Sequence, residues 1–202
     1  MLLIQKKEDT YQMKILVISS YPNHTGFNYI IKKTVLDNIN SMHEVTEIDL
    51  YKEQFDPVLH FDENHRRRDL VSDPYTEKYR ELIKASDLFI FIYPIWWGGM
   101  PAILKGFIDR VFVKGFAYEY KGIFPVPLLK QKKAWIINSN DTPYLYARFV
   151  QKDYGRVLRK QILNMCGIKT IKHSQIYFVR SSTKQKRIKF LNKIAKISQK
   201  IK

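Results

Sequence analysis

Residues 20–28, SYPNHTGFN, bring hydroxyl, amide and glycine groups together directly before an apolar pattern of helical spacing. Free backbone N–H groups and the positive end of the helix dipole make such a helix start a good site for an anion. The side chains of Thr25 and Asn28 add hydrogen-bonding groups, so the segment predicts a phosphate site. It contains neither GxGxxG nor a Walker A sequence, which argues against a Rossmann dinucleotide site or nucleotide hydrolysis here. The alternative is an ordinary helix start, capped by Thr25 or Asn23.

Residues 93–101, YPIWWGGMP, place two tryptophans beside two glycines after an apolar run. Glycine lets backbone approach a flat ligand closely, and aromatic side chains offer a stacking surface for an isoalloxazine or quinone ring. The alternative is that Trp96 and Trp97 belong to the core or to a dimer interface, where aromatic residues are enriched.

The remaining reactive residue types lack the spacing of a catalytic or metal site. His24 alone among the histidines lies in one of these segments, and a surface turn explains it equally well. The other histidines lack metal-ligand spacing, so we expect no metal. Cys166 precedes a glycine that ends a helical pattern, and we interpret it as a core residue and not as a nucleophile.

Short apolar runs alternate with stretches of helical periodicity, which is typical of a parallel sheet with helices on both faces. The expected strands are Lys14–Ser19, His43–Leu50, Leu88–Tyr93, Ala134–Asn138 and Ile171–Val179. With right-handed crossovers they predict an α/β fold, a flavodoxin-like doubly wound five-stranded parallel sheet of order 2-1-3-4-5. Ligands bind such sheets beyond the carboxyl ends of the first and third strands. The loops 20–28, 94–100 and 139–146 are therefore expected to meet there.

The chain is expected to form one domain over residues 13–202. Helical faces lie around residues 25–39, 75–87, 100–112, 154–165 and 190–201. Residues 51–74 are irregular and polar with two prolines, and we interpret them as an insertion. Met13 looks like an alternative beginning, so residues 1–12 are predicted to be an N-terminal extension.

The net charge of +16 is the strongest feature of the composition. A basic surface attracts nucleic acid, anionic membranes or phosphorylated cofactors. No RNP-type or helix-turn-helix pattern accompanies the charge, so we expect no nucleic-acid partner. The basic C-terminal helix leaves open a peripheral contact with a membrane partner.

The longest apolar run, residues 88–104, approaches the length of a membrane span. Pro94, Gly98, Gly99 and Pro101 interrupt it, so we do not expect an integral membrane protein. Leu2–Ile4 is too short for the core of a signal peptide. A single cysteine fits a reducing compartment, and we expect a cytoplasmic protein.

The segment YPIWWGGMPAILKGFIDRVFVKGFAY, residues 93–118, closely resembles the signature of the NAD(P)H:quinone oxidoreductase family. NHTGFNYIIK and DLYKEQFDPVL are similar to further segments of that family. The resemblance implies bound FMN, with FAD as the alternative. It implies Thr25, Phe27 and Asn28 at the flavin phosphates, and a ring site lined by Pro94, Ile95, Trp96, Trp97 and Gly98. It also implies a homodimer with the acceptor pocket at its boundary, to which Phe107, Phe112, Phe116 and Tyr118 contribute.

The third loop, NSNDTPYLYA, departs from the Thr-Thr-Gly-Gly run of well-known family members. Ser139 and Asn140 occupy the first two positions, while Asp141 and Thr142 replace the glycines. Tyr144 or Tyr146 stands in for the family's catalytic tyrosine, and the segment holds no histidine. Because a carboxylate would oppose an anionic reduced flavin, Asp141 is expected to point away, or to cap a helix or form an Asx turn.

These features favour a ping-pong oxidoreductase that passes a hydride from NAD(P)H through the flavin to a quinone-like acceptor. The first alternative is a flavin-binding ancillary subunit of a potassium efflux system with secondary reductase activity. The second is a one-electron flavodoxin carrier, although carriers of that class are typically acidic and this chain is basic.

Overall fold

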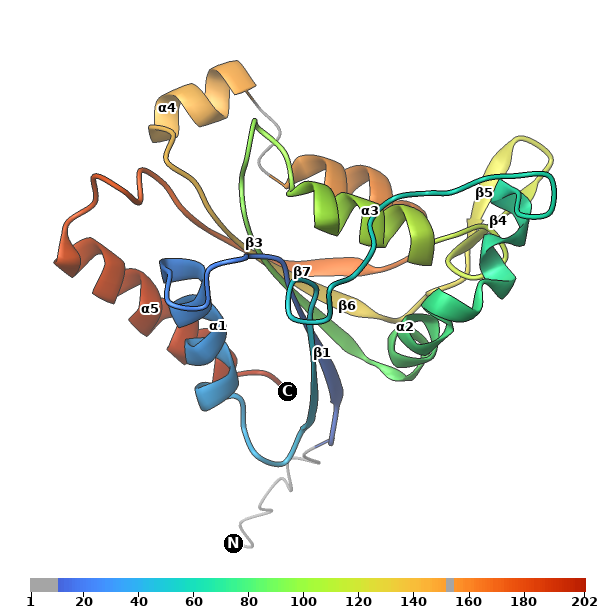
Figure 1. Cartoon of the computed structure of the whole chain (residues 1–202). Coiled ribbons are helices and arrows are strands. Elements are labelled where there is room, and N and C mark those ends of the chain that lie inside the picture. The colour runs from blue at the N-terminus through green and yellow to red at the C-terminus, as the bar shows by residue number, and fades with distance from the viewer. Residues whose placement is uncertain (1–10, 152–154) are drawn as a thin grey trace, which may run out of the picture.

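An all-parallel sheet of five strands forms the centre of the computed structural model, which describes residues 11–151 and 155–202. Its order is β2-β1-β3-β6-β7 (Figure 1). The strands are β1 Lys14–Ser19, β2 Glu44–Asp49, β3 Leu88–Pro94, β6 Lys133–Ser139 and β7 Lys169–Ile176. Numbered within this sheet alone, the order is 2-1-3-4-5, so the predicted doubly wound flavodoxin-like fold is confirmed.

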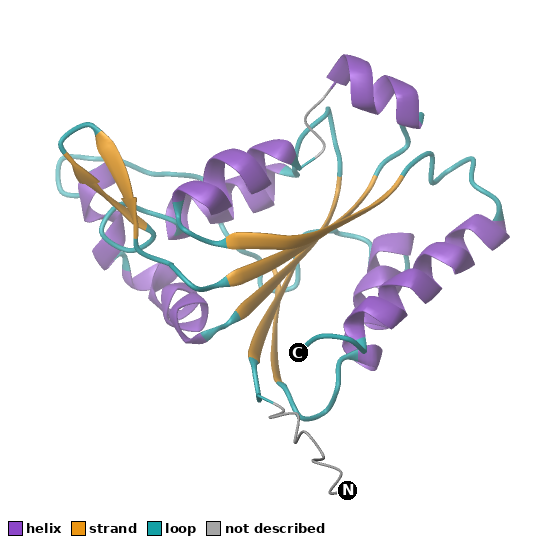
Figure 2. Cartoon of the chain, turned by 180° about the vertical axis from the view of Figure 1, so that it is seen from behind, coloured by secondary structure: helices purple, strands orange, loops and turns teal. Residues whose placement is uncertain are grey.

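Helices cover both faces of the sheet, as Figure 2 shows. On one face lie α1 (Phe27–Asn38) and α5 (Lys184–Ser198). On the other lie α2 (Pro74–Ala85), α3 (Ala102–Val111) and the π-helical segment η3 (Val157–Leu163). Within the described ranges, no helix is long and apolar enough to cross a bilayer.

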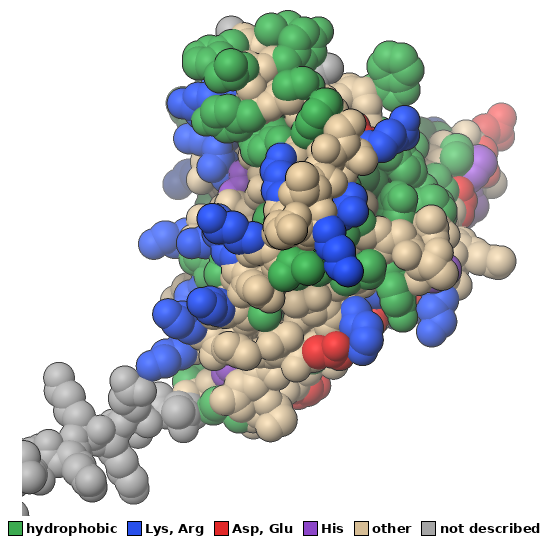
Figure 3. All heavy atoms as spheres, turned by 90° about the vertical axis from the view of Figure 1, so that its left-hand side faces the viewer, with side chains coloured by type: hydrophobic (Ala, Val, Ile, Leu, Met, Phe, Trp, Pro, Cys, Tyr) green, Lys and Arg blue, Asp and Glu red, His purple; other side chains and the backbone are tan. Residues whose placement is uncertain are grey.

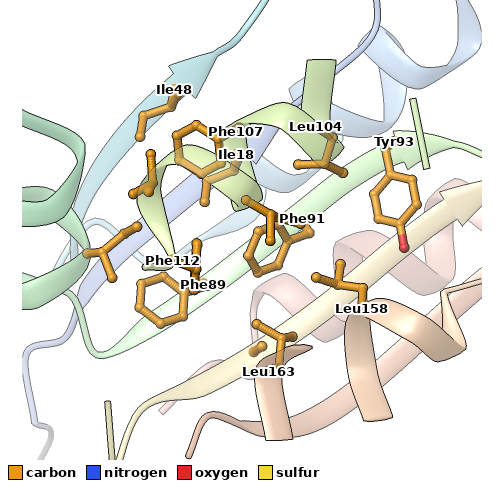
Figure 4. Packing of buried hydrophobic residues seen from close by; sticks show 14 of the residues in the cluster. Ile18, Ile48, Phe89, Phe91, Tyr93, Leu104, Phe107, Phe112, Leu158 and Leu163 are labelled. Atoms are coloured by element: carbon orange, nitrogen blue, oxygen red, sulfur yellow. The ribbon is translucent and has the colours of Figure 1, made fainter. Parts of the chain in front are cut away.

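The middle strand β3 supplies both halves of the core, since all of its residues are buried. Side chains of successive strand residues point to opposite faces. Phe89, Phe91 and Tyr93 join α3 and η3 in one cluster (Figure 4), and Leu88, Ile90 and Ile92 join α1 and α5 in the other. Phe107 is fully buried in the first cluster. The expectation that it lines an interface or acceptor pocket was therefore wrong, because its ring packs inward against Phe55 and Tyr79.

Residues 51–74 contain only one short regular element, the 3₁₀ helix η1 (Arg67–Ser72). The segment is nevertheless fixed to α3. Arg110 donates hydrogen bonds of 2.8 and 2.9 Å to the side chain and the carbonyl of Asp56. Pro57 packs so closely on Gly106 that any Cβ there would lie 2.3 Å from the Pro57 carbonyl oxygen.

Three regions of the chain depart from the sequence expectation. An antiparallel hairpin, β4 (Tyr118–Lys121) with β5 (Phe124–Pro127), was not predicted. The third loop leads into α4 (Tyr144–Tyr146) and the π-helical η2 (Ala147–Gln151), for which no helix was expected. The last strand, β7, begins and ends earlier than residues 171–179.

Candidate functional site

The three predicted loops meet at the carboxyl edge of the sheet, at the top of Figure 1. Strands β1, β3 and β6 are parallel neighbours, so their final residues lie side by side. The Ser139 hydroxyl donates a 2.9 Å hydrogen bond to the Asn28 side-chain oxygen. The Ile95 N–H donates a 2.7 Å bond to the Ser139 carbonyl. Ile95 of the second loop and Asn28 of α1 are thus both bonded to the end of β6.

The first loop presents the start of α1 to this edge. The Asn23 side-chain oxygen accepts bonds of 2.8 Å from both the backbone N–H and the hydroxyl of Thr25. This local turn leads to Gly26, which is the N-cap residue of α1. No side chain of the described residues caps the helix there. Neither Thr25 nor Asn23 is therefore the cap, and no described side chain occupies the first-turn N–H groups, which suit an anion. Phe27 packs its ring against Phe190, so its contribution to a phosphate site is its backbone.

Buried polar atoms without a partner gather at the same edge. The hydroxyls of Ser19 and Ser20 and the side-chain nitrogen of Asn140 are buried and have no hydrogen-bond partner among the described residues. Burying a polar group without a hydrogen bond is unfavourable, and native structures contain few such groups. Two hydroxyls and an amide beside an open helix start fit a bound phosphate ester and a heterocycle with polar edges.

The second loop forms a tight turn that exposes both tryptophans. The N–H groups of Trp96 and Gly99 each donate a 2.9 Å bond to the carbonyl of the other. Between them, Trp97 has φ +50° and Gly98 has φ +79°, the positive values that type I′ turns require. Trp96 is 41% exposed and Trp97 is fully exposed, while Pro94 and Ile95 are buried. The interpretation of the tryptophans as core residues is therefore wrong.

A bulky residue at positive φ is a conformational outlier that costs of order 1–3 kcal/mol. Such strain is found mainly where function needs the side chain in one place. Trp97 has no burial that repays it. Its ring projects into solvent, while that of Trp96 lies 6.4 Å from the Tyr21 ring.

The third loop keeps Asn140 in the site and turns Asp141 out of it. The Asn140 side-chain oxygen accepts a 3.1 Å bond from the Thr142 N–H. Asp141 instead accepts a 2.7 Å bond from the backbone N–H of Arg180 and lies 3.8 Å from that arginine's Nε. The Asp141 carboxylate is thus bound to Arg180, and the Asx turn belongs to Asn140. That the carboxylate points away from a bound flavin stays a prediction. Tyr144 and Tyr146 are each about half exposed on α4, and the Tyr144 ring packs edge-on against Tyr177.

A buried ion pair between Lys32 and Asp49, which the sequence analysis missed, lies next to the first loop. Lys32 of α1 donates a 2.8 Å hydrogen bond to Asp49 at the end of β2 and also contacts Glu47. His24 lies 3.8 Å from the same Asp49 carboxylate. Burial opposes the charge on Lys32, but its bonds to Asp49 and Glu47 outweigh this and raise its pKa above the usual value. The pair fixes α1 one turn beyond Asn28.

Cys166 is buried in the core, as predicted. Burial raises the pKa of its thiol to about 12. The nucleophilic form is the thiolate, so this cysteine stays inert at neutral pH.

The profile of a protein family described as Flavodoxin-like fold matches residues 13–201. The chain belongs to this family. Among its relatives, a Haemophilus influenzae protein called an uncharacterized NAD(P)H oxidoreductase is 32% identical over 79% of this chain and 81% of its own length. Rat NAD(P)H dehydrogenase [quinone] 1 is 27% identical over 88% of this chain and 73% of its own. The resemblance seen in the sequence is confirmed.

A solved structure with the same fold extends this family relationship. The crystal structure of Smu.1420 from Streptococcus mutans UA159 is 50% identical to this chain, with a TM-score of 0.90. It covers 94% of this chain and 100% of its own. The relatives named as NAD(P)H oxidoreductase and NAD(P)H dehydrogenase [quinone] thus match 79% and 88% of this chain.

Proposed function

We propose that the chain is a flavin-dependent oxidoreductase that takes a hydride from NAD(P)H and reduces a quinone-like acceptor. The observation that carries this proposal is the carboxyl edge of the sheet. There an uncapped helix start, unpartnered buried polar atoms and an exposed tryptophan turn lie together. The names of its relatives support the same chemistry.

Each loop has its own part in holding the flavin. Thr25, Asn28 and the N–H of Phe27 bind the phosphate, since the start of α1 favours negative charge. The backbone groups of residues 94–98 line the isoalloxazine, where Gly98 admits close approach. Ser139 and Asn140 meet its pyrimidine edge. We propose FMN as the flavin, with FAD as the alternative.

When bound, the flavin would supply the redox chemistry, taking a hydride from NAD(P)H and passing two electrons and a proton to the acceptor, which takes its second proton from solvent or a side chain. The chain's own residues orient the reactants. Trp96 and Trp97 offer a stacking surface for donor and acceptor in turn, which gives ping-pong order. Asp141 accepts a hydrogen bond from Arg180, so its carboxylate interacts with the loop after β7. Tyr144 or Tyr146 assists proton transfer.

A second copy of the chain completes the acceptor pocket in this proposal. Large apolar side chains are exposed around α4, where Leu145 and Phe149 are 66% and 64% exposed. These side chains form a hydrophobic cap on the molecule, seen as the green group at the top of Figure 3. Exposed apolar patches on soluble proteins often mark interfaces. Light scattering on the purified protein tests whether it is a dimer. We propose that the protein is cytoplasmic.

The test is an absorption spectrum of the purified protein, before and after reconstitution with FMN, followed by anaerobic addition of NADPH or NADH. We expect flavin bands that bleach on addition and return when a quinone is added. A protein that holds no flavin after reconstitution contradicts the proposal. Bands that do not bleach would instead favour the ancillary-subunit alternative.

A further inference from the structure

A basic hollow of roughly 440 Å³ adjoins the third loop on the side of strand β7. It begins at Tyr144 of α4 and extends along η3 and the exposed side of β7. Four cations line it: Arg148, Arg156, Arg159 and Lys160. Lysine and arginine side chains also line one side of the face in Figure 3, below the hydrophobic cap.

These four cations are not neutralised by the protein in its described part. Two basic side chains elsewhere in the molecule do have carboxylate partners: Lys32 contacts Asp49, and Arg110 contacts Asp56. No described carboxylate lies within ion-pair distance of the four. The Nε of Arg159 is moreover buried without a hydrogen-bond partner among the described residues. A cluster of like charges with an unused donor favours an anionic ligand.

His173, which also lines the hollow, adds a hydrogen-bond donor but no further positive charge. The Asn138 amide nitrogen lies 3.1 Å from His173 Nε2, and because the amide N–H donates, Nε2 accepts. The proton of the neutral ring is then on Nδ1. Burial, together with the charge of Arg159, lowers the pKa of His173 to about 4, so the ring is neutral at pH 7. Tyr144 and Tyr177 complete the hollow with aromatic rings 5.2 Å apart.

The basic surface continues past the first hollow. Arg159 and Lys160 also line an adjacent hollow of roughly 420 Å³, together with Lys169 and Thr170. The hydroxyl of Thr170 is buried and lacks a hydrogen-bond partner among the described residues. Two adjoining hollows that share the same two cations suit a ligand with more than one phosphate.

We propose that this groove binds the phosphates of NADPH, above all the 2′-phosphate of its adenosine half, and so selects NADPH over NADH. The inference rests on the proposed function, which supplies the nicotinamide dinucleotide. The groove starts at Tyr144 in the third loop, so a dinucleotide lying in it extends from the proposed flavin surface. The aromatic rings suit an adenine. Four lining cations that have no carboxylate partner among the described residues suit the additional charge of the 2′-phosphate.

The experiment is calorimetric binding of adenosine 2′,5′-bisphosphate to the flavin-loaded protein, with 5′-AMP as the ligand that lacks the 2′-phosphate. We expect the bisphosphate to bind at least about tenfold more tightly, because hydrogen bonds between charged groups are stronger than those between neutral groups. Arg156→Gln and Arg159→Gln should each remove most of that difference. Lys193→Gln, an exposed charge on α5, is the matched control and should retain it.

Equal binding of the two nucleotides, or equal loss in the Lys193→Gln control, overturns the inference. Kinetics gives an independent readout: Arg156→Gln should raise the KM for NADPH about tenfold, with kcat and the KM for NADH nearly unchanged. A parallel rise in both KM values also overturns it. The two proposals fail separately. Protein without flavin contradicts the proposed function, whereas flavin-loaded protein that ignores the 2′-phosphate contradicts only this inference.

Discussion

The hydroxyl of Ser139 and the side-chain oxygen of Asn28 are joined by a 2.9 Å hydrogen bond across 111 positions of the chain. The bond ties the end of β6 to the first turn of α1, and both residues are buried. It therefore sets the distance between the proposed phosphate site and the proposed ring site. Substitution of either residue should lower the affinity for flavin more than it lowers the stability of the fold.

Asn28→Ala is expected to weaken FMN binding about tenfold or more, because it removes one polar group from the phosphate site and leaves Ser139 without its acceptor. Quenching of flavin fluorescence on titration measures the dissociation constant. Asn38→Ala, at the far end of the same helix, is the matched control and should bind FMN like the parent. An unchanged affinity in Asn28→Ala would show that the phosphate binds elsewhere.

Trp97→Asn should separate stability from activity. Asparagine tolerates positive φ far better than tryptophan, so the variant is expected to melt at the same temperature or slightly higher. Loss of the exposed ring should raise the KM for a quinone several-fold, since aromatic stacking contributes about 0.5–1.5 kcal/mol. Thermal unfolding and steady-state kinetics measure the two effects. Phe61→Asn, another exposed aromatic change, is the control. A large fall in melting temperature would contradict the backbone strain, and an unchanged KM would contradict the stacking role.

The buried pair of Lys32 and Asp49 should make the fold sensitive to acid. Burial alone would raise the pKa of Asp49, but the bonds from Lys32 and the Lys52 N–H, with the Lys32 charge, lower it below 3.8. A carboxyl group with a lowered folded-state pKa stabilises the protein above its unfolded-state pKa, and this contribution is lost as the pH falls through the folded-state pKa.

Asp49→Asn is therefore expected to destabilise the protein at pH 7 by a few kcal/mol, since Lys32 keeps only Glu47. The difference between parent and variant should shrink when the pH is lowered below 3.8. Urea unfolding across this range measures it. Asp37→Asn, which breaks the exposed pair with Lys33, should cost well under 1 kcal/mol. A pH-independent difference would contradict the linkage.

The fold was predictable because its signals are local. Leu88–Tyr93 is apolar throughout, as a strand buried on both faces must be, and α3 follows with an i, i+3, i+4 pattern. The β4–β5 hairpin was missed because Pro125 and Pro127 obscure its strand pattern. Helical spacing around Val157–Leu163 was visible, but its π-helical geometry depends on tertiary packing.

The loops of the site were predictable, but their partners were not. Topology alone places residues 20–28, 94–100 and 139–146 together. The pairing of Asp141 with Arg180, and that of Lys32 with Asp49, joins residues that no sequence spacing relates. Phe107 has the spacing of the α3 core face, yet the resemblance assigned it to a pocket. The helical pattern was the better guide at that position.

Gly106 and Pro57 provide the last test, which concerns how the segment 51–58 is held to α3. Gly106→Ala places a Cβ 2.3 Å from the Pro57 carbonyl oxygen and 2.5 Å from its Cα. Backbone must therefore move, and overpacking of this kind costs about 1–3 kcal/mol although alanine itself favours a helix. Chemical denaturation measures the loss. Lys105→Ala, on the neighbouring exposed position, should change stability by less than about 0.5 kcal/mol. A Gly106→Ala protein as stable as Lys105→Ala would show that the segment yields freely.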